Sequence, residues 1–238
     1  MALKIGIYKD TTASEKRVAI TPEGVAKLTE NSHTLLVESG AGAASSYPDE
    51  SYTEAGAKIV KERSSLFSEA DMIVSFNFPD TDLVKKMKAG AILVCFVWAL
   101  QNNDRVELLK NQKITALAMD AIPRISRAQV MDALSSMSNI AGYKSVLIGA
   151  SELDKYLPMM MTAAGTIPPA KVMVLGAGVA GLQAIATAKR LGAVVEAYDI
   201  RPAVKEQVES LGAKFIEIAT EEELETEGGY AKEASEEH

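Results

Sequence analysis

Gly176-Ala177-Gly178-Val179-Ala180-Gly181 joins a short apolar run, residues 171–175, to a segment whose apolar side chains recur at helical spacing. A second apolar run, residues 194–198, follows that segment and ends at Asp199. A G-x-G-x-x-G sequence between a strand and a helix, with an acidic residue about 20 positions later, is typical of dinucleotide-binding sites. Residues 171–199 therefore predict a strand–turn–helix–strand unit that binds a nucleotide. The alternative is a unit of the same shape with only a structural role.

Each glycine of this turn has an expected physical role. Gly176 permits a tight turn, Gly178 lets a pyrophosphate approach the backbone without a Cβ in the way, and Gly181 lets the helix lie close to the strand. The N–H groups and the positive dipole end of the helix would bind the phosphates. The expected pyrophosphate site consists of Gly176, Ala177, Gly178, Val179, Ala180 and Gly181.

The end of the second strand is expected to bind the adenosine ribose. Asp199 would accept hydrogen bonds from the ribose hydroxyls and would repel a 2′-phosphate, which favours NAD over NADP. Ile200 and Arg201 follow in the same loop and complete the expected cofactor-binding residues. The positive charge of Arg201 weakens the preference for NAD.

The composition is that of an ordinary globular protein, with 238 residues of which 47% are hydrophobic and 24% charged. The longest apolar run, residues 91–100, is too short to span a bilayer, and the first residues lack a signal-peptide layout. The single cysteine, Cys95, excludes an intrachain disulfide and is expected to be an inert core residue in a reducing compartment.

The net charge of −7 is concentrated at one end of the chain. Residues 217–238 contain nine Glu and one Lys, which leaves the preceding residues close to neutral. Nucleic acid is not an expected partner, because no basic stripe with interleaved aromatic residues occurs. No metal site is expected.

Strand and helix patterns alternate in the first half of the chain. Strands are predicted at 3–7, 34–38, 71–76, 91–97 and 114–119, and helices at 22–30, 51–56, 81–88 and 103–111. Thr21-Pro22-Glu23 has the composition of a helix start. The near-continuous apolar strands indicate a parallel sheet that is covered by helices on both faces.

We therefore predict an α/β fold with two Rossmann-like parallel-sheet domains joined by a long helical linker. The first domain is expected over residues 1–137, and residues 138–238 are expected to hold the linker helix and a partial NAD-binding domain. Residues 126–161 have helical character with breaks at Gly142, Gly149 and Pro158. Thr166-Ile167-Pro168-Pro169 follows as the clearest interruption of the chain, because two consecutive prolines cannot continue a helix. Met159-Met160-Met161 is interpreted as core packing rather than as a docking surface.

The second domain supplies only two strands and a short third, residues 214–218, where a complete doubly wound domain has five or six. Such a sheet has an open edge and an uncovered face. Either the chain is a fragment, cut or naturally short, or another copy completes the sheet.

A second group of polar residues surrounds Arg124. Pro123 is expected to end a strand and to place Arg124 in a loop, after which Gln129, Asp132 and Ser135 would lie near one helical face. Ala128, Met131 and Leu134 would pack inward. These groups have the donors and acceptors to fix a carboxamide and a diphosphate, although spacing alone favours a solvated helix.

Several longer stretches together resemble the NAD(H)-binding component of proton-translocating nicotinamide nucleotide transhydrogenases. The resemblance is carried by residues 123–129, 131–136, 139–144, 161–170, 176–193 and 228–233, and extends from residue 3 to the end. The N-terminal pattern from Lys9 through residues 17–23 is shared more broadly with alanine dehydrogenases.

This resemblance implies two α/β domains that bind NAD(H) and work as a homodimer. The component would dock against an NADP(H)-binding component held on a membrane proton channel, and hydride would pass directly between the two nicotinamides, coupled to proton movement. The chain would be active as an enzyme only with these partners, and its location would be cytoplasmic, peripheral to the inner membrane. Direct transfer depends on positioning and on exclusion of water.

The resemblance also assigns roles to individual residues. Arg124 would contact the cofactor near its nicotinamide end, and Gln129 would reach toward the partner's nucleotide. Asp132 and Ser135 would orient the carboxamide of the dihydronicotinamide. Tyr143 is a weaker assignment and is as easily a packed aromatic side chain.

Two positions depart from the alanine dehydrogenase pattern. Those enzymes have a substrate-binding lysine and a catalytic histidine where this chain has Ser75 and Phe96, and its two histidines are His33 and His238. Imine chemistry needs a group that transfers a proton, so an amino-acid dehydrogenase is disfavoured. The remaining alternative is a non-catalytic NAD-binding or assembly module derived from the transhydrogenase component.

Overall fold

The computed structural model describes residues 2–217 of the chain. The chain divides into two compact units between Asp132 and Ala133. The division lies a few residues before the predicted boundary at 137/138, because helix α6 (Ala133–Glu152) is continuous from its first residue and packs within the second unit. Apart from Glu217, the acidic stretch at the end of the sequence lies outside the described residues, and so do residues 228–233.

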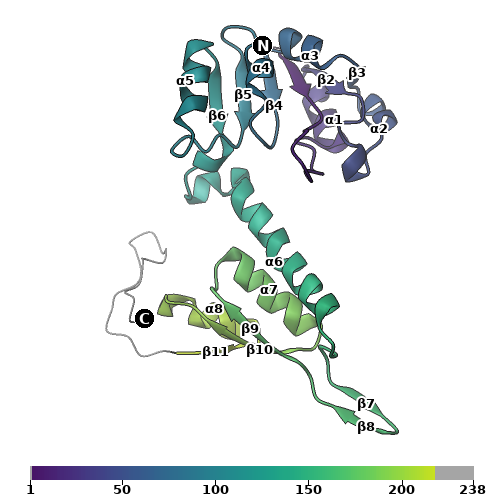
Figure 1. The fold of residues 1–238 in the computed structure, drawn as a ribbon, viewed down its shortest axis with the longest axis vertical. Coiled ribbons are helices and arrows are strands. Elements are labelled where there is room, and N and C mark those ends of the chain that lie inside the picture. The colour runs from purple at the N-terminus through teal and green to yellow at the C-terminus, as the bar shows by residue number, and fades with distance from the viewer. Residues whose placement is uncertain (1, 218–238) are drawn as a thin grey trace. The chain divides into compact units, whose positions relative to one another are not determined.

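The first unit contains a six-stranded parallel sheet with the order β3-β2-β1-β4-β5-β6 (Figure 1). Its strands are β1 (Lys4–Ile7), β2 (Thr34–Glu38), β3 (Lys58–Val60), β4 (Met72–Val74), β5 (Ile92–Cys95) and β6 (Thr115–Ala118). The chain moves outward from β1 to β3 and then returns to β4 on the other side of β1. This topology is doubly wound and confirms the predicted α/β class.

Five helices accompany this sheet. They are α1 (Pro22–Glu30), α2 (Asp49–Glu54), α3 (Arg63–Glu69), α4 (Thr81–Val84) and α5 (Asn103–Asn111). The predicted start of α1 is confirmed, since the Thr21 hydroxyl accepts a hydrogen bond from the Gly24 N–H and Pro22 is the first helical residue. Strand β3 and helix α3 were not predicted, and α4 is shorter than the predicted segment 81–88.

The core of the first unit lies on both faces of the sheet. Ile7, Ile73 and Leu93 on the central strands are fully buried, as two-sided coverage requires. Cys95 is also fully buried, and burial together with the nearby Asp120 raises the pKa of its thiol to about 12. The cysteine is therefore an inert core residue, as predicted.

The second unit begins with α6 and contains a three-stranded parallel sheet of order β11-β10-β9. Its further elements are β7 (Met160–Thr162), β8 (Gly165–Ile167), β9 (Lys171–Leu175), α7 (Val179–Arg190), β10 (Val194–Tyr198), α8 (Lys205–Ser210) and β11 (Lys214–Phe215). The predicted strand–turn–helix–strand unit over residues 171–199 is confirmed.

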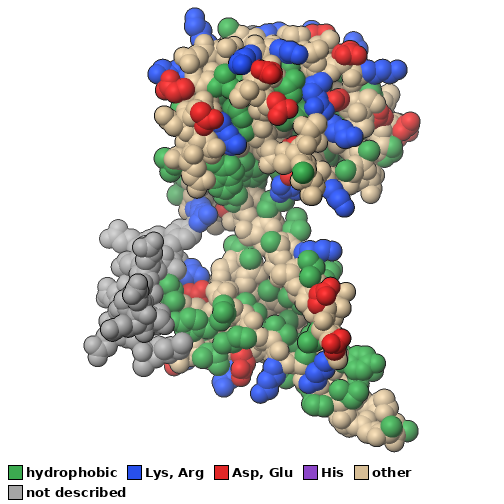
Figure 2. All heavy atoms as spheres, in the orientation of Figure 1, with side chains coloured by type: hydrophobic (Ala, Val, Ile, Leu, Met, Phe, Trp, Pro, Cys, Tyr) green, Lys and Arg blue, Asp and Glu red, His purple; other side chains and the backbone are tan. Residues whose placement is uncertain are grey.

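Two predictions for the region before β9 are wrong. Helix α6 runs without a break through Gly142 and Gly149. Residues 160–167 form an antiparallel hairpin, β7–β8, whose apolar side chains are visible at the surface in Figure 2. Met161 is 74% exposed, so Met159-Met160-Met161 does not pack in the core of the described chain.

One face of the second sheet carries exposed apolar side chains. Strand β9 alternates between half-buried and exposed residues, and Leu175 on its outer face is 77% exposed. Helix α7 packs on the inner face through Ile185 and Ala188. Among the described residues, β9 and β11 are the two edge strands of this sheet, in agreement with the predicted open edge and uncovered face.

Helices α6 and α7 approach each other closely at Gly142. A Cβ on Gly142 would lie 2.0 Å from the carbonyl oxygen of Ala180, whereas a Cβ on Gly149, in the same helix, would meet no atom within 4 Å. Only glycine fits at the first position, while the second tolerates any helix-forming residue.

We predict that Gly142→Ala destabilises the chain by about 1–3 kcal/mol, because α6 must move away from α7. Gly149→Ala is the matched control and should be neutral or stabilise by about 0.5–1 kcal/mol, as alanine does in a helix interior. Urea denaturation of both variants measures the difference. Equal effects of the two substitutions would contradict the close contact.

Candidate functional site

The glycine turn connects the carboxyl end of β9 to the start of α7. Gly176 has a φ of +95°, a conformation that favours glycine, and its N–H donates to the Tyr198 carbonyl at 2.8 Å. Gly181 lies in the first turn of helix α7 and faces the glycine turn. A Cβ on Gly181 would lie 1.8 Å from the Gly176 carbonyl oxygen. The expected roles of both glycines in the turn and in close packing are thus borne out geometrically.

Gly178 differs from its two neighbours in the motif. A Cβ there would meet no atom within 4 Å, and its φ of −76° suits any residue. The first helical hydrogen bond runs from the Leu182 N–H to the Gly178 carbonyl at 2.8 Å. The N–H groups that come before Leu182 in the first turn therefore have no partner within the helix. Gly178 therefore keeps space open in front of a helix N-terminus.

The carboxylate of Asp199 lies against this turn. Leu175 and Tyr198 are partners in the parallel register of β9 and β10, so the residues that follow them leave the sheet side by side. Asp199 Oδ2 accepts the Ala177 N–H at 2.6 Å, and the Asp199 side chain is only 5% exposed. Sequence reasoning missed this bond, which follows from the strand register.

Arg201 holds the same carboxylate from the other side. Its backbone N–H and its Nε both donate to Oδ1 of Asp199 at 2.9 Å, and Nη2 donates to Oδ2 at 2.9 Å. Burial by itself would raise the pKa of Asp199, but the hydrogen bonds from Arg201 and Ala177 and the charge of Arg201 outweigh it and lower the pKa. Asp199 is therefore ionised at neutral pH and fully hydrogen-bonded. Ile200, between them, is half-buried.

The second predicted group does not lie on one helical face. Gln129 belongs to a 3-10 helix, Ser126–Met131, while Asp132 has a non-helical backbone and Ser135 lies in the first turn of α6. The tighter 3-10 turn and the break at Asp132 separate side chains that a continuous α-helix would align. The spacing-based prediction is wrong in this respect.

The structure places these residues in two consecutive segments. Arg124 and Gln129 are exposed, and Asp132 and Ser135 are half-buried. The division between the units falls directly after Asp132, so Ser135 belongs to the second unit. The predicted inward packing is found for Ala128, whereas Met131 is exposed. Tyr143, on α6, is 48% exposed and is not a packed core aromatic.

Aromatic and hydroxyl side chains occupy the positions where alanine dehydrogenases were expected to carry lysine and histidine. The Ser75 hydroxyl donates to the Asn77 carbonyl at 2.9 Å, and Phe96 stacks between Phe76 and Trp98 with ring centroids 6.2 and 6.1 Å away. His33, the histidine within the described residues, accepts the Leu3 N–H at 3.2 Å. At the carboxyl ends of β4 and β5, the Ser75 hydroxyl is thus bound to a backbone carbonyl and Phe96 has no ionisable group, whereas His33 lies at the opposite, amino end of β2.

Arg17, in the loop after β1, is already occupied. Its Nε and Nη2 donate to the two carboxylate oxygens of Glu15 at 2.8 and 2.7 Å, and its guanidinium lies 4.3 Å from the ring centroid of Phe76. The hydrogen bonds from Arg17 lower the pKa of Glu15 to about 2. A carboxylate substrate would have to displace Glu15 to reach this arginine.

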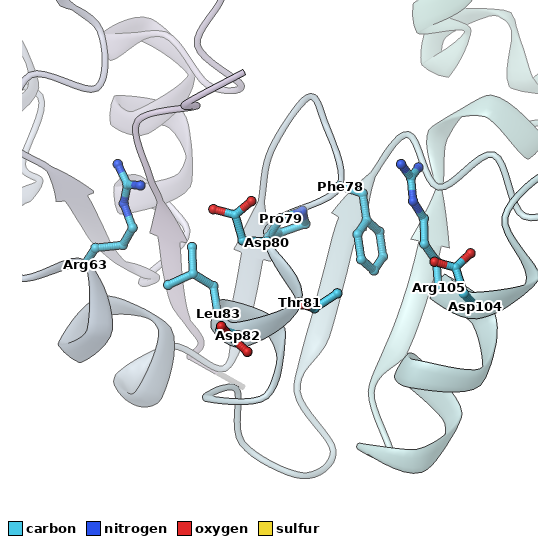
Figure 3. Close-up of a pocket in the computed structure, with 9 residues that line it drawn as sticks. All are labelled: Arg63, Phe78, Pro79, Asp80, Thr81, Asp82, Leu83, Asp104 and Arg105. Atoms are coloured by element: carbon cyan, nitrogen blue, oxygen red, sulfur yellow. The ribbon is translucent and has the colours of Figure 1, made fainter. Parts of the chain in front are cut away.

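A pocket of about 680 Å³ lies elsewhere in the first unit (Figure 3). Arg63 and Arg105 stand on its two sides and Asp80 lies between them. Arg63 is paired with Glu38 at 3.0 Å and Arg105 donates to the Val97 carbonyl at 3.0 Å. The pocket contains none of the predicted site residues and lacks an unengaged cation for an anionic ligand, so we assign no function to it.

Two further findings concern metal-binding groups and membrane-spanning helices among the described residues. Over residues 2–217, no group of His, Cys, Asp and Glu side chains is arranged to hold a metal ion. Over the same residues, no helix has the length and apolar character needed to cross a membrane. Within this range, the arrangement with the clearest chemical capacity is the open helix N-terminus beside the buried carboxylate.

Residues 6–141 match the family model described as alanine dehydrogenase/PNT, N-terminal domain, and residues 145–235 match the C-terminal domain model of the same family. The chain is 54% identical over 242 residues to an NAD(P) transhydrogenase subunit alpha protein of Rhodospirillum rubrum, covering 99% of this chain and 63% of that protein. It is 32% identical over 203 residues to alanine dehydrogenase of Staphylococcus haemolyticus, covering 84% and 54%.

Solved structures give the same pattern. A transhydrogenase from Sinorhizobium meliloti superposes with a TM-score of 0.87 at 47% identity, covering 90% of this chain and 64% of that one. An L-alanine dehydrogenase superposes with a TM-score of 0.77 at 29% identity, covering 89% and 60%. The chain thus spans less than two thirds of the length of these relatives.

We predict that Asp199→Asn destabilises the chain at pH 7 by about 1–3 kcal/mol, because a largely buried guanidinium loses its charged partner. The folded-state pKa of Asp199 is lowered, so its contribution is complete above the ordinary aspartate pKa of about 3.9 and is lost as the pH falls through the folded-state pKa. Denaturant unfolding at several pH values should therefore show a wild-type-to-variant difference that shrinks below about pH 4. A difference that is constant with pH would contradict the ion pair.

Proposed function

This chain belongs to the alanine dehydrogenase/PNT family, and from that membership we propose that it is the NAD(H)-binding part of a transhydrogenase. In this proposal it passes hydride from NADH to NADP⁺ on a partner component, coupled to proton translocation across a membrane. Its homologues include transhydrogenase alpha subunits, which supports an oxidoreductase component with a Rossmann-like nucleotide site. The structural observation that supports nucleotide binding in this proposal is the open space at Gly178 in the glycine turn.

The NAD(H) site is proposed at the carboxyl ends of β9 and β10. The pyrophosphate would bind the N–H groups of the first turn of α7, where the helix dipole favours negative charge and where Gly178 leaves room. The adenosine ribose would bind at Asp199. Residues Gly176 to Gly181 and Asp199 to Arg201 would surround the adenosine diphosphate half of the cofactor.

The reaction proposed for the nicotinamide end requires positioning rather than acid–base chemistry. A hydride that moves directly between two nicotinamides needs no proton donor or acceptor in the protein. Arg124 would contact the cofactor near its nicotinamide end, and Asp132 and Ser135 would orient the carboxamide. This assignment suits polar residues without a histidine or a reactive cysteine.

Gln129 is proposed to reach toward the NADP(H) on the partner component. It is exposed, and its neighbour Val130 is 94% exposed, with Met131 exposed beside it. Apolar side chains displayed beside a polar one fit a surface that another component covers. NADP(H) would thus be held by the partner and not by this chain.

A homodimer, peripheral to the cytoplasmic side of the inner membrane through its partners, is proposed as the working form. Support comes from the apolar side chains exposed on hairpin β7–β8, where Met161 and Ile167 are accessible to a second copy.

An amino-acid dehydrogenase is the less supported function, because Ser75 and Phe96 offer no group for proton transfer and Arg17 is held by Glu15.

We predict that the chain binds NADH saturably and more tightly than NADPH, as measured by NADH fluorescence. Gly178→Ala should fold as the wild type does but bind NADH at least about tenfold more weakly, because the methyl group enters the space needed by the pyrophosphate. Gly149→Ala, the same substitution at an open position on α6, should bind NADH unchanged. Unaltered binding by Gly178→Ala would place the cofactor elsewhere.

We predict that the chain, mixed with the partner component, catalyses hydride transfer from NADH to an NADP analogue. Gln129→Ala should lower this rate several-fold and leave NADH affinity unchanged, since the side chain acts on the partner's nucleotide. Gln207→Ala, an exposed glutamine on α8, is the control. NADH binding without any transfer in the mixture would favour the non-catalytic NAD-binding or assembly module.

A further inference from the structure

Helices α6 and α7 lie side by side in the second unit (Figure 1). Their backbones touch at Gly142, where a Cβ would lie 2.0 Å from the Ala180 carbonyl oxygen. Glycine has no side chain to interlock with the facing helix. The contact therefore sets how close the helices lie, while other side chains must fix the rotation of α6 about its own axis.

A hydrogen bond between two amide side chains joins the helices three residues before Gly142. Asn139 Nδ2 donates to Gln183 Oε1 at 3.0 Å. Gln183 is held in turn by Thr187: its Nε2 donates to the Thr187 hydroxyl at 3.1 Å, and that hydroxyl donates to the Gln183 carbonyl at 2.7 Å. Thr187 is only 5% exposed. A buried hydroxyl on α7 thus holds the amide whose oxygen accepts a hydrogen bond from α6.

The face of α6 that carries Asn139 also carries Ser135. Ser135, Asn139 and Gly142 are four and three residues apart, which places them on one side of an α-helix. A rotation of α6 that broke the bond from Asn139 to Gln183 would therefore turn Ser135 as well. The site proposed above assigns Ser135 to the carboxamide of the nicotinamide and the first turn of α7 to the pyrophosphate. The bond joins the helix that carries one group to the helix that carries the other.

We propose that Asn139 is a positioning residue of the nicotinamide site. Through its bond to Gln183 it holds α6 at the rotation in which Ser135 meets the carboxamide, and it does not touch the cofactor itself. Asn139 is exposed, so water competes for its amide, and the bond contributes no more than one neutral hydrogen bond. The inference rests on the proposed NAD(H) site and adds a residue to it.

The test compares NADH with ADP-ribose, which has the adenosine diphosphate and both riboses but lacks the nicotinamide. The ratio of the two affinities measures what the nicotinamide contributes. In the full chain with Asn139→Ala, we expect this ratio to fall about three- to tenfold, the range of one neutral hydrogen bond, with ADP-ribose affinity unchanged. Gln183→Met removes the acceptor from the other helix at similar side-chain length, and it should have the same effect.

Two matched variants should keep the wild-type ratio. Gln183→Glu retains an oxygen that accepts from Asn139 and offers another to the Thr187 hydroxyl. Ser145→Ala removes a hydroxyl of α6 that bonds within its own helix, to the Gly142 carbonyl at 2.9 Å. In a Ser135→Ala background, Asn139→Ala should lower the ratio no further, because both substitutions remove the same contact with the carboxamide.

Equal loss of NADH and ADP-ribose affinity in Asn139→Ala would show a general structural role and contradict the inference. An unchanged ratio in either folded variant, Asn139→Ala or Gln183→Met, contradicts it too, and so do effects of Asn139→Ala and Ser135→Ala that add. Because the bond is tested from both helices, one variant decides the question if the other does not fold.

Failure of the proposed function gives a different result. A folded wild-type chain that binds ADP-ribose as tightly as NADH has no nicotinamide contact for Asn139 to position. A folded wild-type chain that binds neither nucleotide contradicts the whole NAD(H) site. A wild-type chain that prefers NADH, with variants that keep this preference, contradicts the role of Asn139 alone.

Discussion

The hydrogen bond from the Ala177 N–H to Asp199 connects the two features on which the site depends. The parallel register of β9 and β10 brings the ends of both strands together, and the carboxylate then spans from one loop to the other. Because the bond is short and nearly out of contact with water, it fixes the turn whose next residues begin α7. The position of the helix N-terminus, and with it the proposed anion site, follows from the pairing of two short strands.

The first unit has the topology of a ligand-binding α/β domain, but the side chains at the carboxyl ends of its central strands contact one another. At the carboxyl ends of its central strands, Phe96 lies in an aromatic stack and Arg17 is bound to Glu15. These groups satisfy one another, so the edge where such folds usually bind a ligand offers no unpaired charge at these positions. In the proposed reaction, this unit contributes positioning residues near Arg124 instead of a substrate pocket.

Sequence predicted the features that depend on backbone geometry better than those that depend on side-chain exposure. Gly176 and Gly181 have their expected roles because a positive φ at the first and a close backbone contact at the second favour glycine. The helical face around Gln129 was wrong, since α and 3-10 turns of one apolar pattern cannot be told apart over six residues. The buried interpretation of Met161 failed because an exposed hairpin and a core strand use the same residues. The hydrogen bonds of Asp199 to both Ala177 and Arg201 could not be predicted from the sequence, because they depend on which loops lie together in the fold.

Helix α6 also sets the distance between Ser135 and the glycine turn. Ser135 stands in its first turn, and Gly142 lies two turns later, where it contacts Ala180 at the start of α7. Seven residues of α-helix rise about 10 Å, a distance that side-chain motion does not change. A serine proposed to orient a carboxamide and the turn proposed to hold a pyrophosphate are therefore joined by a rigid spacer. A ligand shorter than a dinucleotide could occupy one end of that spacer but not both.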